Sequence, residues 1–349
     1  MSTEAPRSVL LVIPTLNEVN TIEGVVDALC VDLPADADIR IVVADGGSTD
    51  GTVQRVHRMM AGRSELTYLF NPKRIQSAAV NLAALVFGGA SQVLIRCDAH
   101  AMYPPGFVRR LLDTLDRTGA DAVVVPMDSV GRSCLERAVA WVSDTPLGSG
   151  GSAHRGGKRS GFIDHGHHAA FRMTSFRRAG GYDESFTHNE DAELDCRQRA
   201  LGSRVYLDAD IRLGYHPRGT FRGLWRQYFG YGGGRARTIR RHRGSMRWRQ
   251  FAVPAHCIVC LLALAIAPVW PLALIWPALY VLALTAASAL GALRERSTCG
   301  LLAGPAAAVM HAAWAAGFIW SLVRVRETRW QVVMATPLWR DAGPSQVCR

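Results

Sequence analysis

Residues 9–18 read VLLVIPTLNE, and this stretch decides the fold that we predict. Its apolar run ends at Pro14, which is typical of a strand buried on both faces of a parallel sheet. Because strands and helices alternate after it, we predict an α/β fold with a mainly parallel sheet. The predicted strands lie at 39–44, 66–70, 93–96 and 122–126, and the predicted helices at 21–30, 52–60, 75–87, 105–117 and 191–201.

Polar residues follow the carboxyl ends of the predicted strands. Asn17 and Glu18 follow the first strand, Asp45 follows the second, and Asp98 and His100 follow the strand at 93–96. Ligands of open α/β sheets bind outside the carboxyl ends of the strands, so the sequence predicts one cleft at this edge. The stretch 148–166 is rich in Gly, Ser and His, which suits a mobile loop over that cleft.

Charge and hydropathy divide the 349 residues into a soluble part and a membrane part. The net charge is +11, and residues 216–250 hold ten arginines but no Asp or Glu. Such a segment is attracted to anionic lipid. We predict the following division: 1–215, a catalytic domain; 216–250, a basic amphipathic interfacial segment; 251–323, a membrane region of two to three helices; and 324–349, a C-terminal tail.

The number of membrane spans stays open at this point. Apolar segments at about 254–270, 271–291 and 301–323 are each long enough to span. Three spans would place the arginines after residue 323 on the outer side, against the positive-inside tendency. The prolines within 268–277 instead allow a broken or re-entrant first pair.

The N-terminus and the cysteines add two expectations. The first eight residues lack the form of a signal peptide, so we expect the catalytic domain in the cytoplasm, on the inner membrane. The eight cysteines form no metal-binding pattern, and we expect no disulfide framework.

Four motifs together resemble the family 2 glycosyltransferases of the GT-A fold, a Rossmann-like architecture. They are VLLVIPTLNE at 9–18, DGGSTDGT at 45–52, Asp98-Ala99-His100, and Asn189-Glu190-Asp191. The succinoglycan-biosynthesis type of glucosyltransferase is the most similar subgroup, through NPKR at 71–74, RCDAHA at 96–101, DHGHH at 164–168, GGYDE at 180–184 and YHPR at 215–218.

The resemblance implies an inverting hexosyltransferase of exopolysaccharide biosynthesis. Its donor would be a UDP-sugar, with glucose as the sugar, and its acceptor a polyprenyl-diphosphate-linked saccharide. The processive members carry a Gln-x-x-Arg-Trp motif, whereas Gln227 is followed here by YFGY, so we expect addition of one residue. Two alternatives are a polyprenyl-phosphate sugar transferase and a membrane-tethered basic protein that binds nucleic acid, although we expect no nucleic-acid partner.

Donor contacts are expected at the strand ends. Asp45 can accept from a base imide or a ribose hydroxyl, whereas Asp50 is better interpreted as a helix N-cap. Asp98 suits Mg²⁺ or Mn²⁺, which would bridge the donor phosphates. His100 is a second candidate metal ligand, although imidazole is a poor ligand for Mg²⁺ and a structural role is equally open. The resemblance implies donor binding for Pro14, Thr15, Asn17, Glu18, Asp45, Arg74 and Asp98.

Acceptor contacts are expected around Asp191, the candidate general base. The alternative is that Asp191, Glu190 and Glu193 are only the acidic first turn of a helix, and the glycines at 180–181 also suit a helix C-cap. The histidines, His154 and His165 among them, match no closed zinc motif. Acceptor or phosphate contacts are expected from Glu190, His167, His168, Gly181, Tyr182, Gln227 and Arg235.

Overall fold

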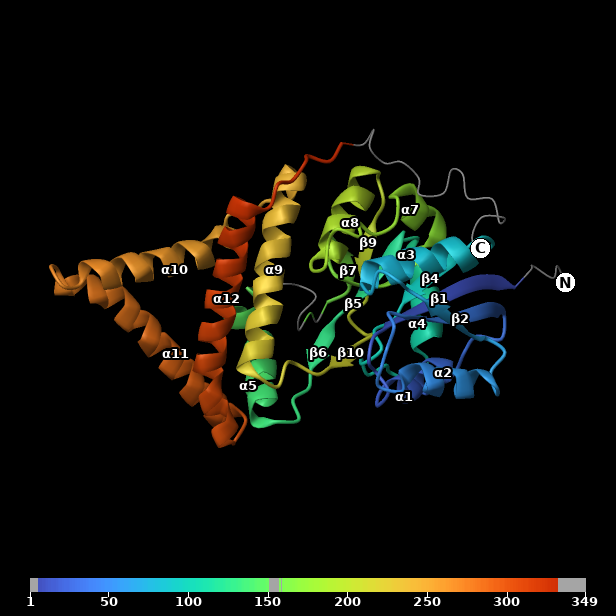
Figure 1. Cartoon of the computed structure of the whole chain (residues 1–349), viewed down its shortest axis with the longest axis horizontal. Helices are drawn as coiled ribbons and strands as arrows, with labels where there is room; N and C mark the ends of the chain where they lie inside the picture. The colour runs from blue at the N-terminus through green and yellow to red at the C-terminus, as the bar shows by residue number, and fades with distance from the viewer. Residues whose placement is uncertain (1–5, 151–156, 158, 332–349) are drawn as a thin grey trace. The chain divides into compact units, whose positions relative to one another are not determined.

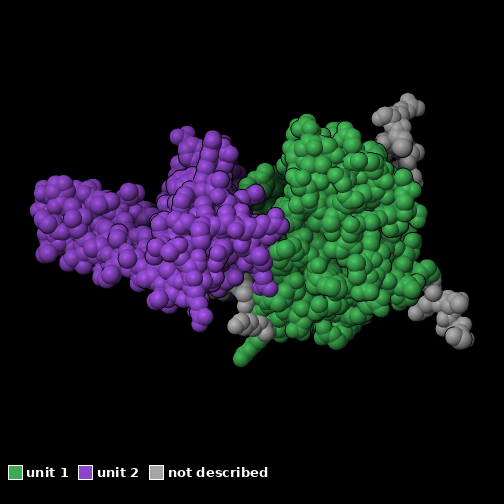
Figure 2. Space-filling model, turned by 90° about the horizontal axis from the view of Figure 1, so that it is seen from below, with its two compact units in different colours: residues 1–127, 157–214, 331–349 green, residues 128–156, 215–330 purple. Residues whose placement is uncertain are grey.

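Two compact units make up the structure, a computed structural model that describes residues 6–150, 157 and 159–331. The first unit holds residues 1–127, 157–214 and 331–349, and the second holds 128–156 and 215–330 (Figure 2). Residues 128–150, which the sequence analysis assigns to the catalytic domain, thus group with the C-terminal helices.

Within the described residues, an eight-stranded mixed sheet forms the centre of the first unit, in the order β3-β2-β1-β4-β8-β5-β9-β7. The strands β7 (Gly161–Ile163) and β8 (His167–Arg172) run antiparallel to their neighbours. The other six strands pair in parallel with at least one neighbour, which confirms the mainly parallel sheet that we predict. Its parallel strands are β1 (Arg7–Thr15), β2 (Ala37–Asp45), β3 (Leu66–Phe70), β4 (Val93–Arg96), β5 (Ala122–Val125) and β9 (Val205–Leu207).

Helices cover both faces of this sheet (Figure 1). Successive side chains of a strand point to opposite faces, so Val9 and Leu11 of β1 belong to one buried cluster, and Leu10 and Val12 belong to the other. The first cluster includes side chains of α1 (Ile22–Cys30), α2 (Thr52–Met60) and α4 (Phe107–Thr118), and the second includes those of α3 (Gln76–Phe87), α7 (Met173–Arg178) and α8 (Glu190–Ala200).

Several features of this unit differ from the sequence analysis, which predicted neither β9 nor α7. The strand β8 was not predicted, because HHAAFR has no apolar run and no clear period. The single loop expected at 148–166 is wrong, since α6 (Pro146–Ser149) ends inside this range and β7 lies within it. Residues 151–156 and 158 of that loop lie outside the described residues.

The second unit is mainly helical. Among the residues that the structure describes, three helical stretches are long and apolar enough to cross a membrane: Arg249–Ile266, Pro271–Arg294 and Thr298–Arg324. A short sheet of β6 (Met127–Ser129) and β10 (Leu213–Tyr215) lies at the boundaries between the segments of the two units. The helices are α5 (Cys134–Ser143), α9 (Phe221–Arg241), α10 (Arg249–Ile266), α11 (Ile275–Arg294) and α12 (Ala303–Arg324), with 3-10 turns η1 (Arg243–Ser245), η2 (Pro271–Leu274) and η3 (Thr298–Leu302).

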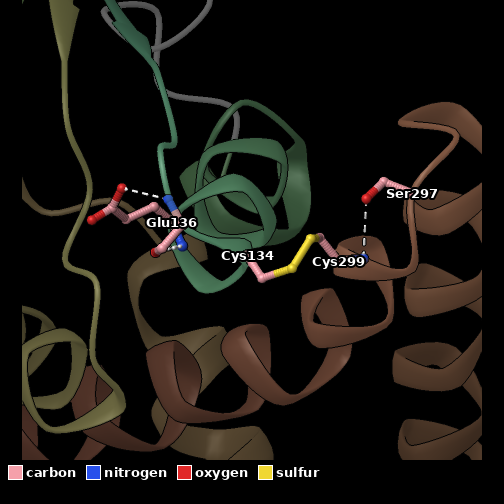
Figure 3. The surroundings of a disulfide bond; sticks show 5 residues. Cys134, Glu136, Ser297 and Cys299 are labelled. Carbon is pink, nitrogen blue, oxygen red and sulfur yellow. Dashed lines mark hydrogen bonds between the residues drawn. A yellow bond between two sulfur atoms is a disulfide. The ribbon is translucent and has the colours of Figure 1, made fainter.

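A disulfide joins the start of α5 to η3 (Figure 3). It links Cys134 and Cys299, which are 165 residues apart in the sequence and whose Cα atoms are 4.7 Å apart. Our expectation of no disulfide is wrong here, because sequence spacing cannot reveal a pair that folding brings together. Beside it, Ser133 and Glu136 form a capping box that starts α5.

The helices α9 and α12 pack so closely that their backbones meet. Leu224 and Tyr228 of α9 share a buried cluster with Met310 of α12. A Cβ atom added to Gly317 of α12 would overlap the backbone carbonyl of Phe229. The segment predicted to be interfacial therefore contains a helix whose one face is buried by protein.

This contact predicts a difference between two glycine variants. Gly317→Ala should destabilise the second unit by about 1–3 kcal/mol, because the added methyl group forces the two helices apart. At Gly233 the same methyl would lie 3.5 Å from the carbonyl oxygen of Gly317, an ordinary contact. Gly233→Ala should therefore be neutral or slightly stabilising. Thermal unfolding of the detergent-solubilised proteins measures both, and equal midpoints would contradict the packing described here.

Candidate functional site

The parallel strands β1 to β4 end at one edge of the sheet. Thr15 pairs in register with Asp45, and Asp45 pairs with Phe70. Val12 of β1 pairs with Arg96, the last residue of β4. The strand ends that we predicted to form one cleft therefore do lie side by side.

Hydrogen bonds join the loops that follow β1 and β2. The Asn17 side-chain oxygen accepts from the backbone N–H of Thr49 at 2.9 Å, and the backbone N–H of Asn17 donates to the Ser48 hydroxyl at 2.7 Å. The backbone N–H of Glu18 donates to the Thr52 hydroxyl at 2.8 Å. These bonds shape the loops, and donor contact by Asn17 and Glu18 stays a prediction.

Asp45 is fully buried and stabilises its own turn. Its Oδ2 accepts from the backbone N–H groups of Gly47 and Ser48, at 2.8 and 2.9 Å, and its Oδ1 accepts from the Ser48 hydroxyl. A carboxylate offers about four acceptor positions, so these bonds leave capacity for a further donor. Contact between Asp45 and a nucleoside stays a prediction.

Asp50 has the structural role that we predict, although not at the N-cap itself. Its Oδ1 accepts from the backbone N–H and the hydroxyl of Thr52, at 3.0 and 2.6 Å. The N-cap of α2 is Gly51, whose φ of 100° suits glycine.

The other predicted donor residues lie at the same edge. The Thr15 hydroxyl is buried and donates to the Ile13 carbonyl at 2.9 Å. Pro14 is partly buried beside it, and Arg74 is exposed in the turn after β3. A Cβ at Gly46 would lie 3.2 Å from the Arg74 Cα, so this turn touches the loop after β2. Donor binding by Pro14, Thr15 and Arg74 stays a prediction.

His100 is held by Glu18. The His100 Nδ1 lies 2.9 Å from Glu18 Oε1, and Thr21 donates its hydroxyl to Glu18 Oε2 at 2.7 Å. Burial alone would raise the pKa of Glu18, but the bonds with His100 and Thr21 lower it below its ordinary value. Because Nδ1 is engaged in this way, the geometry favours a structural role for His100, and metal binding by it stays a prediction.

Arg96 lies at the centre of the cluster that contains the predicted catalytic residues. Its guanidinium is buried and donates to Asp191 Oδ1. Its Nη2 lies 3.6 Å from Asp98 Oδ1 and 3.5 Å from Glu190 Oε1. Burial alone would lower the pKa of Arg96, but Asp191 above all raises it well above its ordinary value.

His167 lies between Asp98, the predicted metal ligand, and Asp191, the predicted general base. Its Nε2 is 3.4 Å from Asp98 Oδ2, and its Nδ1 is 3.5 Å from Asp191 Oδ2. Burial alone would lower the pKa of His167, but the two carboxylates raise it to about 9. Burial also acts on Asp98, yet His167 and Arg96 hold the pKa of that carboxyl well below its usual range. The Gln76 amide donates to Asp98 Oδ1 at 2.7 Å.

Tyr182 supports Asp191 from a buried position. Its hydroxyl donates to Asp191 Oδ1 at 2.9 Å and accepts from Arg96 at 3.1 Å. The structure therefore favours positioning of Asp191 over the acceptor contact that we predict for Tyr182. Gly181, with φ of 69°, closes the C-terminal end of α7 by donating to Phe176 at 3.0 Å, so a helix end accounts for this glycine.

Glu190 is the carboxylate of the cluster whose negative charge is least well balanced by nearby cations. Burial and the charge of Asp191 raise its pKa to about 7, although Arg96 acts in the opposite direction. Asn189, with φ of 66°, starts α8, so both carboxylates lie in the first turn of that helix. The favourable helix dipole explains their presence there, but it does not account for their shared contact with Arg96.

Other residues predicted to contact acceptor or phosphate bond to partners outside the cluster around Arg96. His165 Nδ1 is 2.7 Å from the buried Asp195 Oδ2. His154 and the side chain of His168 lie outside the described part of the chain. Gln227 donates to the Tyr231 hydroxyl at 3.0 Å and Arg235 donates to the Ser245 carbonyl at 2.7 Å, both within the second unit. Acceptor contacts by these residues stay predictions.

The sequence analysis gave no role to Arg96 or Gln76 and did not place His167 between the carboxylates. The signal for Arg96 was an arginine that ends the otherwise apolar strand VLIR, since a buried guanidinium requires carboxylate partners. No local pattern marks Gln76 or the position of His167.

The site fits a cation that is shared with a bound phosphate. No group of three or more His, Cys, Asp or Glu side chains within the described ranges is arranged to hold an ion. Mg²⁺, however, is commonly held by one or two carboxylates, and water and substrate phosphates complete its coordination. The Asp98 side chain is 16% exposed and could serve as such a carboxylate ligand.

Comparisons with known proteins agree on one family. A model described as glycosyl transferase family 2 matches residues 10–180. The chain is 44% identical over 321 residues to the succinoglycan biosynthesis protein ExoA of Rhizobium meliloti (strain 1021), which covers 89% of this chain and 94% of that protein.

Two solved structures are similar in fold. The mannosyltransferase PcManGT from Pyrobaculum calidifontis, in complex with GDP-Man and Mn²⁺, has a TM-score of 0.54 at 24% identity and covers 91% of this chain and 88% of its own. GalNAc-T7, with UDP, GalNAc and Mn²⁺, has a TM-score of 0.54 at 15% identity and covers 72% of this chain and 51% of its own. At these identities the likeness concerns the fold alone.

The raised pKa of Glu190 predicts a pH-dependent effect of Glu190→Gln. Because the carboxyl has a pKa of about 7 in the folded chain and an ordinary value of 4.5, its ionisation opposes folding. The destabilisation is absent below about pH 4.5 and grows as the pH rises through about 7. At pH 8 and without divalent cations, Glu190→Gln should be more stable than the native protein by on the order of 2 kcal/mol.

Thermal unfolding in detergent between pH 5 and 8 measures this difference. The exposed Glu295, replaced by Gln, is the matched control and should show no such trend. A constant difference between Glu190→Gln and the native protein across the pH range would refute the prediction.

Proposed function

The chain belongs to glycosyl transferase family 2, and from that premise we propose its donor, its acceptor and its catalytic residues. It is a glycosyltransferase with a GT-A fold, as the sequence analysis predicted. We propose that it moves glucose from UDP-glucose to a polyprenyl-diphosphate-linked saccharide, with inversion at the anomeric carbon, in exopolysaccharide assembly. The name of the relative in succinoglycan biosynthesis and the apolar helices of the second unit support this proposal.

One observation carries the proposal. Asp98 and Asp191, which the family motifs assign to the donor and the acceptor side, contact the same two cations, Arg96 and His167. Two carboxylates with different tasks are thus held a short distance apart, as a direct transfer between two substrates requires.

Asp191 is proposed to act as the general base. As the anomeric carbon bonds to the acceptor oxygen, the hydroxyl proton of the acceptor passes to Asp191 and the bond from the sugar to the diphosphate breaks. Arg96 and Tyr182 both bind Oδ1, so they fix the direction of the carboxylate. We propose that Oδ2 receives the proton.

The donor diphosphate is proposed to lie beside Asp98. A divalent cation bound by Asp98 would neutralise the charge that develops on the departing nucleotide. Arg96, whose Nη2 lies 3.6 Å from Asp98 Oδ1, adds a permanent positive charge at the same place. The loops after β1 and β2, stabilised by Asp45, would receive the nucleoside. We place the first unit in the cytoplasm, with the second unit on the inner membrane and its arginines near anionic lipid.

The base assignment predicts the behaviour of Asp191→Asn. Transfer should fall at least about a thousandfold, because an amide cannot take up the proton, while binding of UDP should remain. Transfer is measured with radiolabelled donor in washed membranes, and binding by calorimetry on purified protein. The exposed Asp113, replaced by Asn, is the matched control and should retain full activity. An active Asp191→Asn enzyme would remove Asp191 from this role.

The donor and the metal are tested in one screen. Washed membranes should transfer sugar from UDP-glucose in the presence of Mg²⁺ or Mn²⁺, and EDTA should abolish the transfer because, without the cation, the negative charge of Asp98 would repel the diphosphate. His100→Ala should leave the order of metal preference unchanged, since Glu18 already engages this ring. Thin-layer analysis then separates a lipid-diphosphate saccharide from a lipid-monophosphate sugar. The second product, or preference for another nucleotide sugar, would contradict the proposed substrates.

A further inference from the structure

The three apolar helical stretches of the second unit differ strongly in burial. The share of residues buried within the protein is 11% for Arg249–Ile266 and 6% for Pro271–Arg294, but 44% for Thr298–Arg324. A helix that faces lipid should expose apolar side chains around its circumference, as α10 and α11 do. The helix α12 is instead partly a protein core helix.

The partners of α12 precede every candidate membrane segment in the chain. Val139 and Val142 of α5 and Leu224 of α9 share a buried cluster with Ala306 and other residues of α12. Because α5 and α9 come before α10, no candidate span among the described residues separates them from the first unit in the sequence. They must therefore lie on the same side of the membrane as the active site.

The start of α12 is held on that side by its packing against α5. Cys299 lies in η3, directly before α12, with its Cα atom 4.7 Å from that of Cys134 at the start of α5 (Figure 3). The chain has passed through α10 and α11 between these two residues. The segment that contains α10 and α11 therefore starts and ends on the same side of the membrane.

The end of α12 is tied to the same side by α9. The Arg240 guanidinium donates to the carbonyl of Ser321 at 3.0 Å, in the last turn of α12. Just beyond the helix, Glu327 accepts from Arg237 and from Arg241, the latter at 2.9 Å, and its side chain is only 2% exposed. Both ends of α12 are thus held by elements that precede the first apolar helix.

The helix α9 cannot accompany α12 across a bilayer. It carries arginines in its first two turns, at Arg222 and Arg226, and again from Arg235 to Arg241. Arginine in the hydrocarbon core is unfavourable, and Arg222 and Arg226 are exposed. Because α12 packs along α9, it shares the position of α9 outside the hydrocarbon.

We infer that α12 does not cross the membrane, and that α10 and α11 form a hairpin that enters the bilayer from one face and returns to the same face. Lipid covers the exposed apolar side chains of α10 and α11. Figure 1 shows the two helices diverging from a common tip, with α12 lying beside the far ends of both. The tip points away from α12, so it is the deepest part of the hairpin.

The tip is suited to a water-free medium. Between Phe251 and Leu293 the sequence contains no Asp, Glu, Lys or Arg. In the turn that joins α10 and η2, the N–H groups of Val269 and Trp270 donate to the Ile266 carbonyl at 3.0 Å. Pro268 and Pro271 have no N–H to satisfy. In hydrocarbon every backbone donor needs such an internal partner.

The length of α10 agrees with a hairpin that stays in the bilayer. Its 18 residues extend about 27 Å, and a slanted helix reaches less deep than its length. The hydrocarbon core is about 30 Å thick. The hairpin also keeps the arginines after residue 323 on the side of the active site, as the positive-inside tendency requires.

The sidedness of the two termini tests this inference. The full-length protein carries one epitope tag at each terminus, and protease is added to intact spheroplasts and to inverted membrane vesicles. We expect both tags to be protected in the first and cleaved in the second. Tags on opposite sides would overturn the inference, because they require an odd number of crossings. Extraction of the protein by alkaline carbonate would also overturn it, because a lipid-inserted hairpin resists such treatment.

A matched pair of variants tests which helix contacts hydrocarbon. Ala283 lies near the middle of α11 and Ala312 near the middle of α12, and both are exposed. Ala283→Lys should lower the carbonate-resistant fraction at least twofold, while Ala312→Lys should leave it unchanged. Equal losses would mean that α12 is also embedded. Neither measurement needs enzymatic activity, so the result is independent of the proposed substrates.

Discussion

The buried charge of Arg96 is the interaction on which the rest of the site depends. A guanidinium keeps its proton under all physiological conditions, so its burial requires carboxylates in the right places. Asp98 comes from the end of the same strand, whereas Glu190 and Asp191 come from the first turn of α8. Removing Asp191, which accepts directly from Arg96, would break a buried ion pair, and such a loss usually costs about 3–5 kcal/mol. Arg96 therefore couples the position of α8 to that of β4, and the carboxylate that we propose for the donor to the one that we propose for the acceptor.

Much of the first unit could be predicted from local pattern. The strands at 66–70 and 93–96 have the predicted bounds, because short apolar runs buried on both faces leave little freedom of assignment. The strand β8 could not be predicted, since its place between β4 and β5 depends on pairing with distant segments rather than on its own period. The same holds for the link between Cys134 and Cys299, which only the completed fold brings together.

Some residues of the site could likewise be predicted from the sequence, and others could not. Asp98 and Asp191 were identified because motifs mark them, and the structure places both beside Arg96. His167 was named as a phosphate or acceptor contact, yet its position between the two carboxylates depends on β8 and could not be predicted. Sugar selectivity depends on the shape of a pocket around the hexose, which residue types and spacing do not encode. The family assignment thus carries the reaction class, while the structure identifies the side chains that hold its carboxylates.

The order of segments in the second unit has a consequence for biosynthesis. The helix α5 leaves the ribosome early, but the surface of α12 that buries Val139 is made after residues 157–214 of the first unit and after the hairpin. At roughly 5–20 residues per second, the delay is about 10–30 s. During that time the face of α5 that α12 will bury stays exposed. The hairpin is already made by then, so it can enter lipid before α12 completes the second unit.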